Sequence, residues 1–274
     1  MTATAPRPDA RDAAPSPPST PLLEVDQVTL RFGGLRALTE VSFTVEPGEL
    51  FAIIGPNGAG KTSIFNCLNQ VYRPQEGHIR LDGRSIMGKR PTTTAHLGIA
   101  RTFQNLALFK NLDVIDNLML GRHHLMKTGF LSGMLWVGWA RREELAHRRR
   151  CEEIAEMIGL AEYRSTPVGL LPYGVQKRIE LGRALAMEPR LLLLDEPVAG
   201  MNLEETEDMA RYICRINGEF GVAMILVEHD MHLVMDIADR VLAIDFGVPI
   251  ALGTPEAVRD NPRVIEAYLG ESAP

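Results

Sequence analysis

Apolar and polar residues alternate in two stretches near the start of the chain, Leu22 to Phe32 and Ala37 to Val45. Such alternation is typical of strands that bury one face. The dipeptide Gly33-Gly34 separates the two stretches and favours a tight turn. The pattern therefore predicts two antiparallel strands joined at this turn.

Three later runs are continuously apolar: LFAIIG at 50–55, LLLLD at 191–195 and VAMILVE at 222–228. Each precedes a polar segment that is compatible with a helix. Strands buried on both faces of an α/β sheet have this pattern, so the runs predict parallel strands of one doubly wound core. Ligands of such folds bind at the carboxyl ends of the strands.

The long stretch between the first two of these runs, residues 98–188, has helical periodicity and little strand character. It predicts a helical subdomain inserted into the α/β core. Residues 140–160 mix charges of both signs with apolar residues, which is typical of a solvated helix face. The first 21 residues are rich in Pro, Ala and Ser and predict a disordered tail, which leaves 22–270 as one domain.

Composition narrows the classes of function. The net charge of -6 excludes the electrostatic attraction that nucleic-acid binding needs, so no nucleic acid is expected as a partner. The three cysteines form no C-x-x-C pair, which argues against a zinc site or a disulfide framework. No apolar stretch has the roughly 18 residues of a membrane-spanning helix, and we expect no signal peptide.

The sequence GPNGAGKT at 55–62 matches the phosphate-binding P-loop pattern, directly after an apolar run and before a helix-compatible segment. Its glycines let backbone N–H groups surround phosphate oxygens, Lys61 places a cation on the β- and γ-phosphates, and Thr62 can ligate Mg²⁺. We expect ATP and Mg²⁺ here. The residues expected to contact nucleotide are Gly55, Pro56, Asn57, Gly58, Ala59, Gly60, Lys61, Thr62 and Ser63.

Two carboxylates end the second apolar run. Asp195 can hold Mg²⁺, directly or through water, while Glu196 can orient and deprotonate a water that attacks phosphate. The alternative is a pair of acids that complements a helix dipole. The P-loop elsewhere in the chain makes the catalytic interpretation the stronger one.

The segment LPYGVQKRIELGRALAMEPRLLLLDEP at 171–197 resembles the signature helix and Walker B strand of ATP-binding-cassette (ABC) ATPases. The resemblance covers nearly the whole chain from Leu22 onward. It implies the ABC ATPase fold: a RecA-like P-loop NTPase core of the α/β class, with an antiparallel β subdomain and the inserted helical subdomain. It also implies an ATPase in which two cassettes close face to face on shared ATP.

This resemblance assigns further residues. Gln104 resembles the glutamine that contacts Mg²⁺ and the lytic water, and His229 the switch histidine that reaches the γ-phosphate. Phe32 resembles the aromatic residue that stacks on adenine, although a buried strand phenylalanine is an equal alternative. The usual LSGGQ signature reads LPYGV here, with Gly174 retained and expected to face the partner's nucleotide. Proline is compatible with the first turn of a helix, so we expect the signature helix to start at Pro172.

The segments FGGLRAL, ARTFQNLALF, VAGMN and GTPEAVRDNPRVIEAYLG resemble ATPase subunits of branched-chain amino-acid importers. Such a subunit lies peripherally on the cytoplasmic face of the inner membrane. Its partners are a second cassette, identical or different, transmembrane permease subunits and, indirectly, an external solute-binding protein. The Trp-containing segment 121–140 either docks on membrane subunits or packs internally. The rival interpretation is a soluble ABC ATPase outside any transporter.

Overall fold

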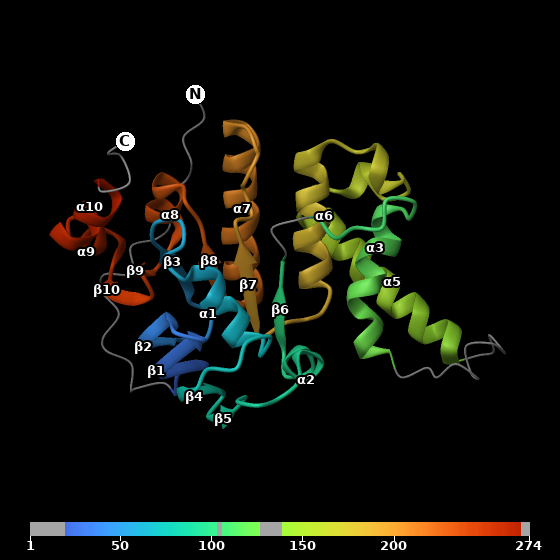
Figure 1. Ribbon diagram of the computed structural model, residues 1–274. Coiled ribbons are helices and arrows are strands. Elements are labelled where there is room, and N and C mark those ends of the chain that lie inside the picture. The colour runs from blue at the N-terminus through green and yellow to red at the C-terminus, as the bar shows by residue number, and fades with distance from the viewer. Residues whose placement is uncertain (1–19, 103–105, 127–138, 270–274) are drawn as a thin grey trace.

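The computed structural model describes residues 20–102, 106–126 and 139–269, and these form two β-sheets surrounded by helices (Figure 1). The expected tail, residues 1–21, lies outside the described residues except for Thr20 and Pro21. The described strands are β1 (Leu23–Phe32), β2 (Leu35–Val45), β3 (Leu50–Ile54), β4 (Glu76–Leu81), β5 (Arg84–Ser85), β6 (Ile99–Arg101), β7 (Leu191–Asp195), β8 (Ala223–Val227), β9 (Arg240–Asp245) and β10 (Val248–Gly253).

The smaller sheet has the order β2-β1-β4-β5 and is antiparallel. Strands β1 and β2 pair across a turn at Gly33 and Gly34, which confirms the expected hairpin. The second strand begins at Leu35, two residues earlier than the alternation indicated.

The larger sheet has the order β10-β9-β3-β8-β7-β6. Strand β3 pairs in parallel with β8, and β8 pairs in parallel with β7, so the three apolar runs form neighbouring parallel strands as expected. Because β8 lies between β3 and β7, the loops that follow these three strands meet at one edge of the sheet. This order is the basis of the site described below.

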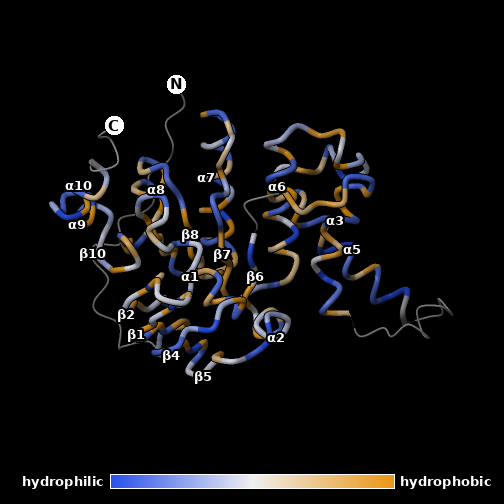
Figure 2. The backbone as a smooth tube through the Cα atoms, in the orientation of Figure 1, coloured by the Kyte–Doolittle hydropathy of each residue, from blue (hydrophilic) through white to orange (hydrophobic). Residues whose placement is uncertain are grey.

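Successive residues of the central strands enter two different cores, since side chains alternate between the faces of a sheet. Phe51 and Ile53 of β3 pack with α1 and the smaller sheet, whereas Ala52 packs on the opposite face with the helices there. All five residues of β3 are buried. Apolar segments lie along β7 and β8 at the centre of the molecule (Figure 2). The larger sheet is therefore covered on both faces.

The described α-helices surround these sheets, and α3, α5 and α6 lie together on the side away from β1 and β2 (Figure 1). The helices are α1 (Lys61–Leu68), α2 (Pro91–His96), α3 (Val114–Arg122), α5 (Trp139–Met157), α6 (Tyr173–Leu185), α7 (Leu203–Phe220), α8 (Met231–Ile237), α9 (Pro255–Arg259) and α10 (Pro262–Leu269). Among the described residues, none of the helices is long and apolar enough to cross a membrane.

The stretch 98–188 holds α3, α5 and α6, but it also contains a strand that its pattern does not indicate. Strand β6 pairs in parallel with β7 and extends the larger sheet at its edge. Ile99–Arg101 is a short strand within a stretch that is otherwise mainly helical in its described residues. Three residues are too few for a periodicity to emerge, and the strand depends on its pairing with β7.

Candidate functional site

The P-loop connects β3 to α1, and its glycines adopt backbone conformations that other residues rarely adopt. Gly58 has φ 79° and Gly60 has φ 106°. A Cβ atom at Gly55 would overlap the carbonyl oxygen of Ile244 on β9, so the chain passes this strand only because glycine has no side chain. The loop is thus shaped by its glycines and by the neighbouring strand.

A cavity of about 180 Å³ lies over this loop and brings together residues from three strand ends. Its walls combine the P-loop with two residues from the loops after β7 and β8. The lining residues are Asn57, Gly58, Ala59, Gly60, Lys61, Thr62, Ser63, Glu196 and His229. The order β3-β8-β7 explains this meeting, because His229 follows the strand between the other two.

Lys61 is buried at the start of α1, and its ammonium group faces the loop itself. Its Nζ atom donates hydrogen bonds to the carbonyl oxygens of Gly55 at 2.6 Å and Pro56 at 2.9 Å. These acceptors hold the cation inside the curve of the P-loop, beside the cavity that Lys61 lines. A positive charge in this place favours a phosphate ligand.

Glu196 and His229 contact each other directly. Nε2 of His229 lies 2.7 Å from Oε1 of Glu196. An ionised carboxylate only accepts hydrogen bonds, so the contact requires a proton on Nε2 of His229. The Glu196 side chain is 17% exposed and that of His229 is 40% exposed, which leaves the pair accessible from the cavity. A ligand bound in the cavity over the P-loop can therefore contact both Glu196 and His229.

Asp195 lies beside this cavity in sequence but does not line it. Its Oδ2 atom forms an ion pair with Nη2 of Arg101 at 2.6 Å, and Nη1 of Arg101 donates to Asn66 of α1 at 2.8 Å. Arg101 ends β6, three positions before Gln104. No sequence pattern indicates the role of Arg101, because its contact depends on the pairing of β6 with β7.

The oxygen donors near the P-loop fit the preferences of Mg²⁺. That ion binds through one or two carboxylates together with substrate phosphates and water. Asp195 offers a carboxylate, and Thr62, which lines the cavity, carries a hydroxyl group. Within the described parts of the chain, no cluster of three or more His, Cys, Asp or Glu side chains forms a metal site. Gln104, the remaining expected ligand, lies outside the described residues.

Phe32 is the last residue of β1, and its side chain is 44% exposed. Its ring packs edge-to-face against Tyr72, with ring centroids 5.0 Å apart. The alternative of a buried strand phenylalanine is therefore wrong. Stacking on adenine stays a prediction, supported by the accessible ring.

The signature segment starts α6 as expected, but the reason for a glycine within it differs from our expectation. Pro172 is the N-cap residue, and the helix begins at Tyr173. A Cβ atom at Gly174 would overlap the Glu205 carboxyl of α7 in the same chain, lying 2.7 Å from its Cδ atom. A side chain at Gly174 thus points into this chain rather than toward a partner's phosphate. The contact between the α6 N-terminus and a partner's nucleotide stays a prediction.

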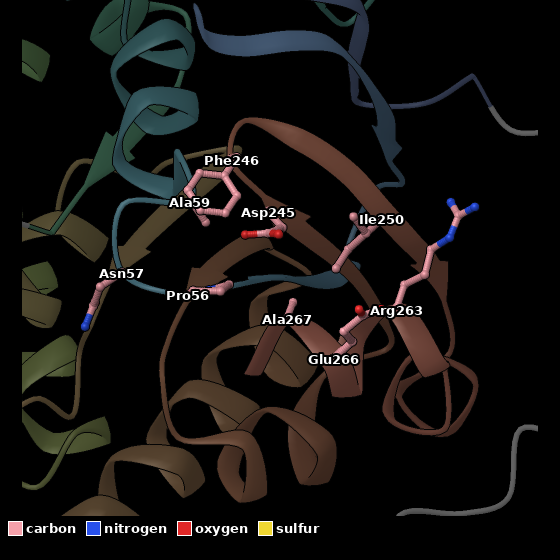
Figure 3. A pocket seen from close by; sticks show the side chains of 9 residues that line it. All are labelled: Pro56, Asn57, Ala59, Asp245, Phe246, Ile250, Arg263, Glu266 and Ala267. Atoms are coloured by element: carbon pink, nitrogen blue, oxygen red, sulfur yellow. The ribbon is translucent and has the colours of Figure 1, made fainter. Parts of the chain in front are cut away.

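A larger cavity of about 570 Å³ adjoins the same loop, between Pro56 and the C-terminal elements β10 and α10 (Figure 3). Phe246 lines it from the tip of the β9–β10 hairpin, where the Phe246 ring lies near Ala59. The backbone N–H of Gly247 donates to the carbonyl oxygen of Ala59 at 2.8 Å. The C-terminal hairpin therefore supports the P-loop from outside.

Of the Trp-containing segment 121–140, residues 127–138 lie outside the described residues.

Comparison with known proteins gives matches along nearly the whole chain. A family model described as "ABC transporter" matches residues 38–199, and one described as "Branched-chain amino acid ATP-binding cassette transporter" matches residues 248–274. The chain is 45% identical to the high-affinity branched-chain amino acid transport ATP-binding protein BraF of Pseudomonas aeruginosa, covering 93% of this chain and 100% of the relative. Identity to LivG of Escherichia coli, which bears the same description, is 42% with the same coverage.

Solved structures agree with this result. An ATP-binding cassette of an ABC transporter in its ADP conformation superposes with a TM-score of 0.80 at 28% identity, covering 92% of this chain and 100% of that chain. A nucleotide-free cassette gives a TM-score of 0.78 at 28% identity, covering 91% and 99%. The expected fold class, an α/β P-loop core with a second sheet and added helices, is confirmed.

Proposed function

The chain belongs to the ABC transporter family, in the group of branched-chain amino acid transport ATP-binding proteins, and we propose that it couples ATP hydrolysis to uptake of branched-chain amino acids or related small polar solutes. It is an ATP-binding protein, an ATPase and a component of a transport system. One observation carries the chemical part of the proposal: a single cavity joins the P-loop to Glu196 and His229. The relatives' names favour a transporter over a soluble ABC ATPase.

Binding of ATP depends on the P-loop and α1. Backbone N–H groups of the loop and the N-terminus of α1 surround the phosphates, and Lys61 supplies a positive charge. Lys61 exchanges the carbonyl oxygens of Gly55 and Pro56 for the β- and γ-phosphates. Phe32 stacks on the adenine ring.

Hydrolysis uses the pair of side chains on the opposite wall of the cavity. Glu196 orients a water molecule toward the γ-phosphorus and accepts a proton from it. Without nucleotide, Nε2–H of His229 donates a hydrogen bond to the Glu196 carboxylate, and when nucleotide binds it keeps its proton and donates to a γ-phosphate oxygen instead. The pair thus links the presence of γ-phosphate to the position of the base.

Thr62 and Asp195, with Gln104, would hold Mg²⁺. When bound, the ion neutralises charge that develops on the phosphate oxygens. Arg101 orients the Asp195 carboxylate through their ion pair. The residues that orient the ion and the phosphates thus come from the ends of β6 and β7 and from the start of α1.

The site is completed by a second cassette, identical or different, whose signature helix approaches the γ-phosphate. In this chain α6 starts with Tyr173 and Gly174, whose backbone N–H groups face the partner's nucleotide. Closing and reopening of the pair move transmembrane permease subunits, to which an external binding protein delivers solute. The chain acts at the cytoplasmic face of the inner membrane.

The test is solute uptake by proteoliposomes that contain the chain, its partner cassette and the permeases, with ATP enclosed and the binding protein outside. We expect uptake of radiolabelled leucine with ATP and no uptake with ADP. A complex carrying Glu196→Gln should bind ATP and transport nothing. Uptake that is the same with ADP, or the same in the variant, would refute the coupling proposed here.

A further inference from the structure

Glu228 is a buried carboxylate that contacts the backbone of the loops carrying Glu196 and His229. It follows β8 directly and precedes His229. Only 3% of its surface is exposed, and it does not line the cavity over the P-loop. A buried carboxylate is costly unless its oxygens accept hydrogen bonds. We therefore expect Glu228 to accept hydrogen bonds that have a structural or functional role.

The two carboxylate oxygens of Glu228 accept hydrogen bonds from two different loops. Oε1 accepts from the backbone N–H of Val198 at 3.0 Å, in the loop that carries Glu196. Oε2 accepts from the backbone N–H of His229 at 3.0 Å. Burial raises the pKa of Glu228, and hydrogen bonds from Val198, His229 and Asp230 oppose this rise. One side chain thus joins the loop after β7 to the turn after β8.

The loop that Glu228 holds contains a residue in an unfavourable conformation. Glu196 has φ 48°, in the left-handed region that residues with a side chain rarely adopt. Its backbone N–H donates to the carbonyl oxygen of Val227 at 2.9 Å, and its carboxylate contacts His229. The hydrogen bond from the Val198 N–H to Glu228 is a third contact of this loop, two residues after Glu196. Such a conformation persists only where surrounding contacts determine it.

We propose that Glu228 is a positioning residue for ATP hydrolysis, whose buried carboxylate sets the geometry of the Glu196–His229 pair without touching substrate. The inference rests on the proposed hydrolytic function. It assigns a role to the residue before the switch histidine, which the sequence motifs leave without one. The mechanism is orientation: two loops from neighbouring strands keep one relative position because one side chain binds both.

Glu228→Gln tests this with little change of shape. The amide keeps one accepting oxygen, but its NH₂ group faces a backbone N–H, so one of the two loops loses its acceptor. The matched control is Glu49→Gln. Glu49 is also a buried carboxylate with a pKa raised by burial, but it contacts Arg240 at the other end of β3.

The first measurement uses the chain alone and does not depend on turnover. Histidine-selective ¹⁵N NMR reports the protonation and hydrogen bonding of the His229 ring, assigned by loss of its signal in His229→Gln. We expect the His229 ring signals to move in Glu228→Gln and to stay in place in Glu49→Gln. Unchanged His229 signals in a folded Glu228→Gln chain would overturn the proposal.

The second measurement is ATPase kinetics of the assembled complex, normalised to bound nucleotide. We expect kcat to fall about 10- to 100-fold in Glu228→Gln, with KM for ATP changed by less than about 2-fold, because the residue orients the base and does not contact ATP. Glu49→Gln should keep a normal kcat. A normal kcat for Glu228→Gln would overturn the proposal, whereas a wild-type complex without ATPase activity would refute the proposed function instead.

A second variant covers the case in which Glu228→Gln does not fold. Glu228→Asp keeps the charge but is shorter by one methylene group, so its carboxylate cannot reach Val198 and His229 at their observed distances together. We expect the same shift of the His229 ring signals and a reduced kcat. Wild-type signals and kcat in Glu228→Asp would overturn the proposal equally.

Discussion

At the scale of single residues, Glu196 combines a strained backbone with a defined side-chain contact. Its left-handed conformation costs about 1–3 kcal/mol for a residue other than glycine. That conformation places the carboxylate 2.7 Å from His229, at the wall of the cavity over the P-loop. Strain that persists at such a place indicates that the position of this side chain matters for function.

The first prediction concerns Glu196→Gln in the assembled complex. The amide keeps the shape but cannot accept a proton, so we expect steady-state ATP hydrolysis to fall by about 100-fold or more while ATP affinity is retained. Exposed Glu204→Gln is the control and should keep wild-type rates. Near-normal hydrolysis in Glu196→Gln would show that another group is the general base.

Lys61→Ala should weaken ATP binding itself, because it removes the positive charge at the phosphates.

The second prediction concerns the buried ion pair of Arg101 with Asp195. Arg101→Met leaves the Asp195 side chain, only 6% exposed, without this counterion, so we expect a loss of about 3 kcal/mol in the free energy of unfolding by urea. Mg²⁺ with ATP should recover part of the loss. Arg80→Met breaks a partly exposed pair with Glu24 and should cost less than about 1 kcal/mol. Equal losses for both variants would contradict the role of Arg101.

At the scale of elements, the start of α6 packs against the start of α7. Glu205 closes a capping box with Asn202, and its carboxyl lies where a side chain on Gly174 would be. Alanine favours a helix over glycine by up to about 1 kcal/mol, but at Gly174 it displaces Glu205 and opens the capping box. The two effects oppose each other.

The third prediction is a double-mutant cycle at this contact. We expect Gly174→Ala to stabilise the chain in a Glu205→Ala background and to be neutral or destabilising in the wild type, with a coupling of about 1 kcal/mol. The free energy of unfolding of all four proteins gives the coupling. The same change in both backgrounds would mean that Glu205 does not explain the glycine.

Pro172→Ser should be tolerated, because an N-cap position favours serine.

Sequence patterns predicted those parts of the site that depend on local chain chemistry. The motif GPNGAGKT between an apolar run and a helix-compatible segment indicates a P-loop, and Glu196 directly follows another apolar run. The roles of Arg101 and Glu228 depend on which strands are neighbours. Neither the short β6 nor the order β3-β8-β7 follows from local periodicity, so these contacts emerge only in the folded chain.

At the scale of the whole molecule, two cores lie on the two faces of the larger sheet, and each contains one buried cysteine among the described residues. Cys67 of α1 lies in one core and Cys151 of α5 in the other. Burial raises the pKa of Cys67 to about 12 and that of Cys151 to about 11. At pH 8 both groups are therefore thiols, which are poor nucleophiles.

The fourth prediction follows from these cores. Iodoacetamide at pH 8 should label the half-buried Cys214 in the native chain and leave Cys67 and Cys151 unlabelled. Because β3, β7 and β8 contribute to both cores, we expect the two buried thiols to become reactive at the same urea concentration. Mass spectrometry of each peptide measures this. Labelling of Cys151 well before Cys67 would show that the helices beyond the sheet unfold separately.

The last prediction concerns assembly. The cavity over the P-loop is lined by residues of this chain alone, and the His229 side chain is 40% exposed there. A γ-phosphate bound here lacks the donors that a partner's signature helix supplies, so the isolated chain should be a monomer with little ATPase activity. Light scattering and ATPase rates over a range of chain concentrations test this. Adding the partner cassette and permeases should raise the rate per chain, and Glu196→Gln should stabilise an ATP-dependent dimer with the partner. Full activity in a sample that stays monomeric, with a rate per chain independent of concentration, would refute the shared site.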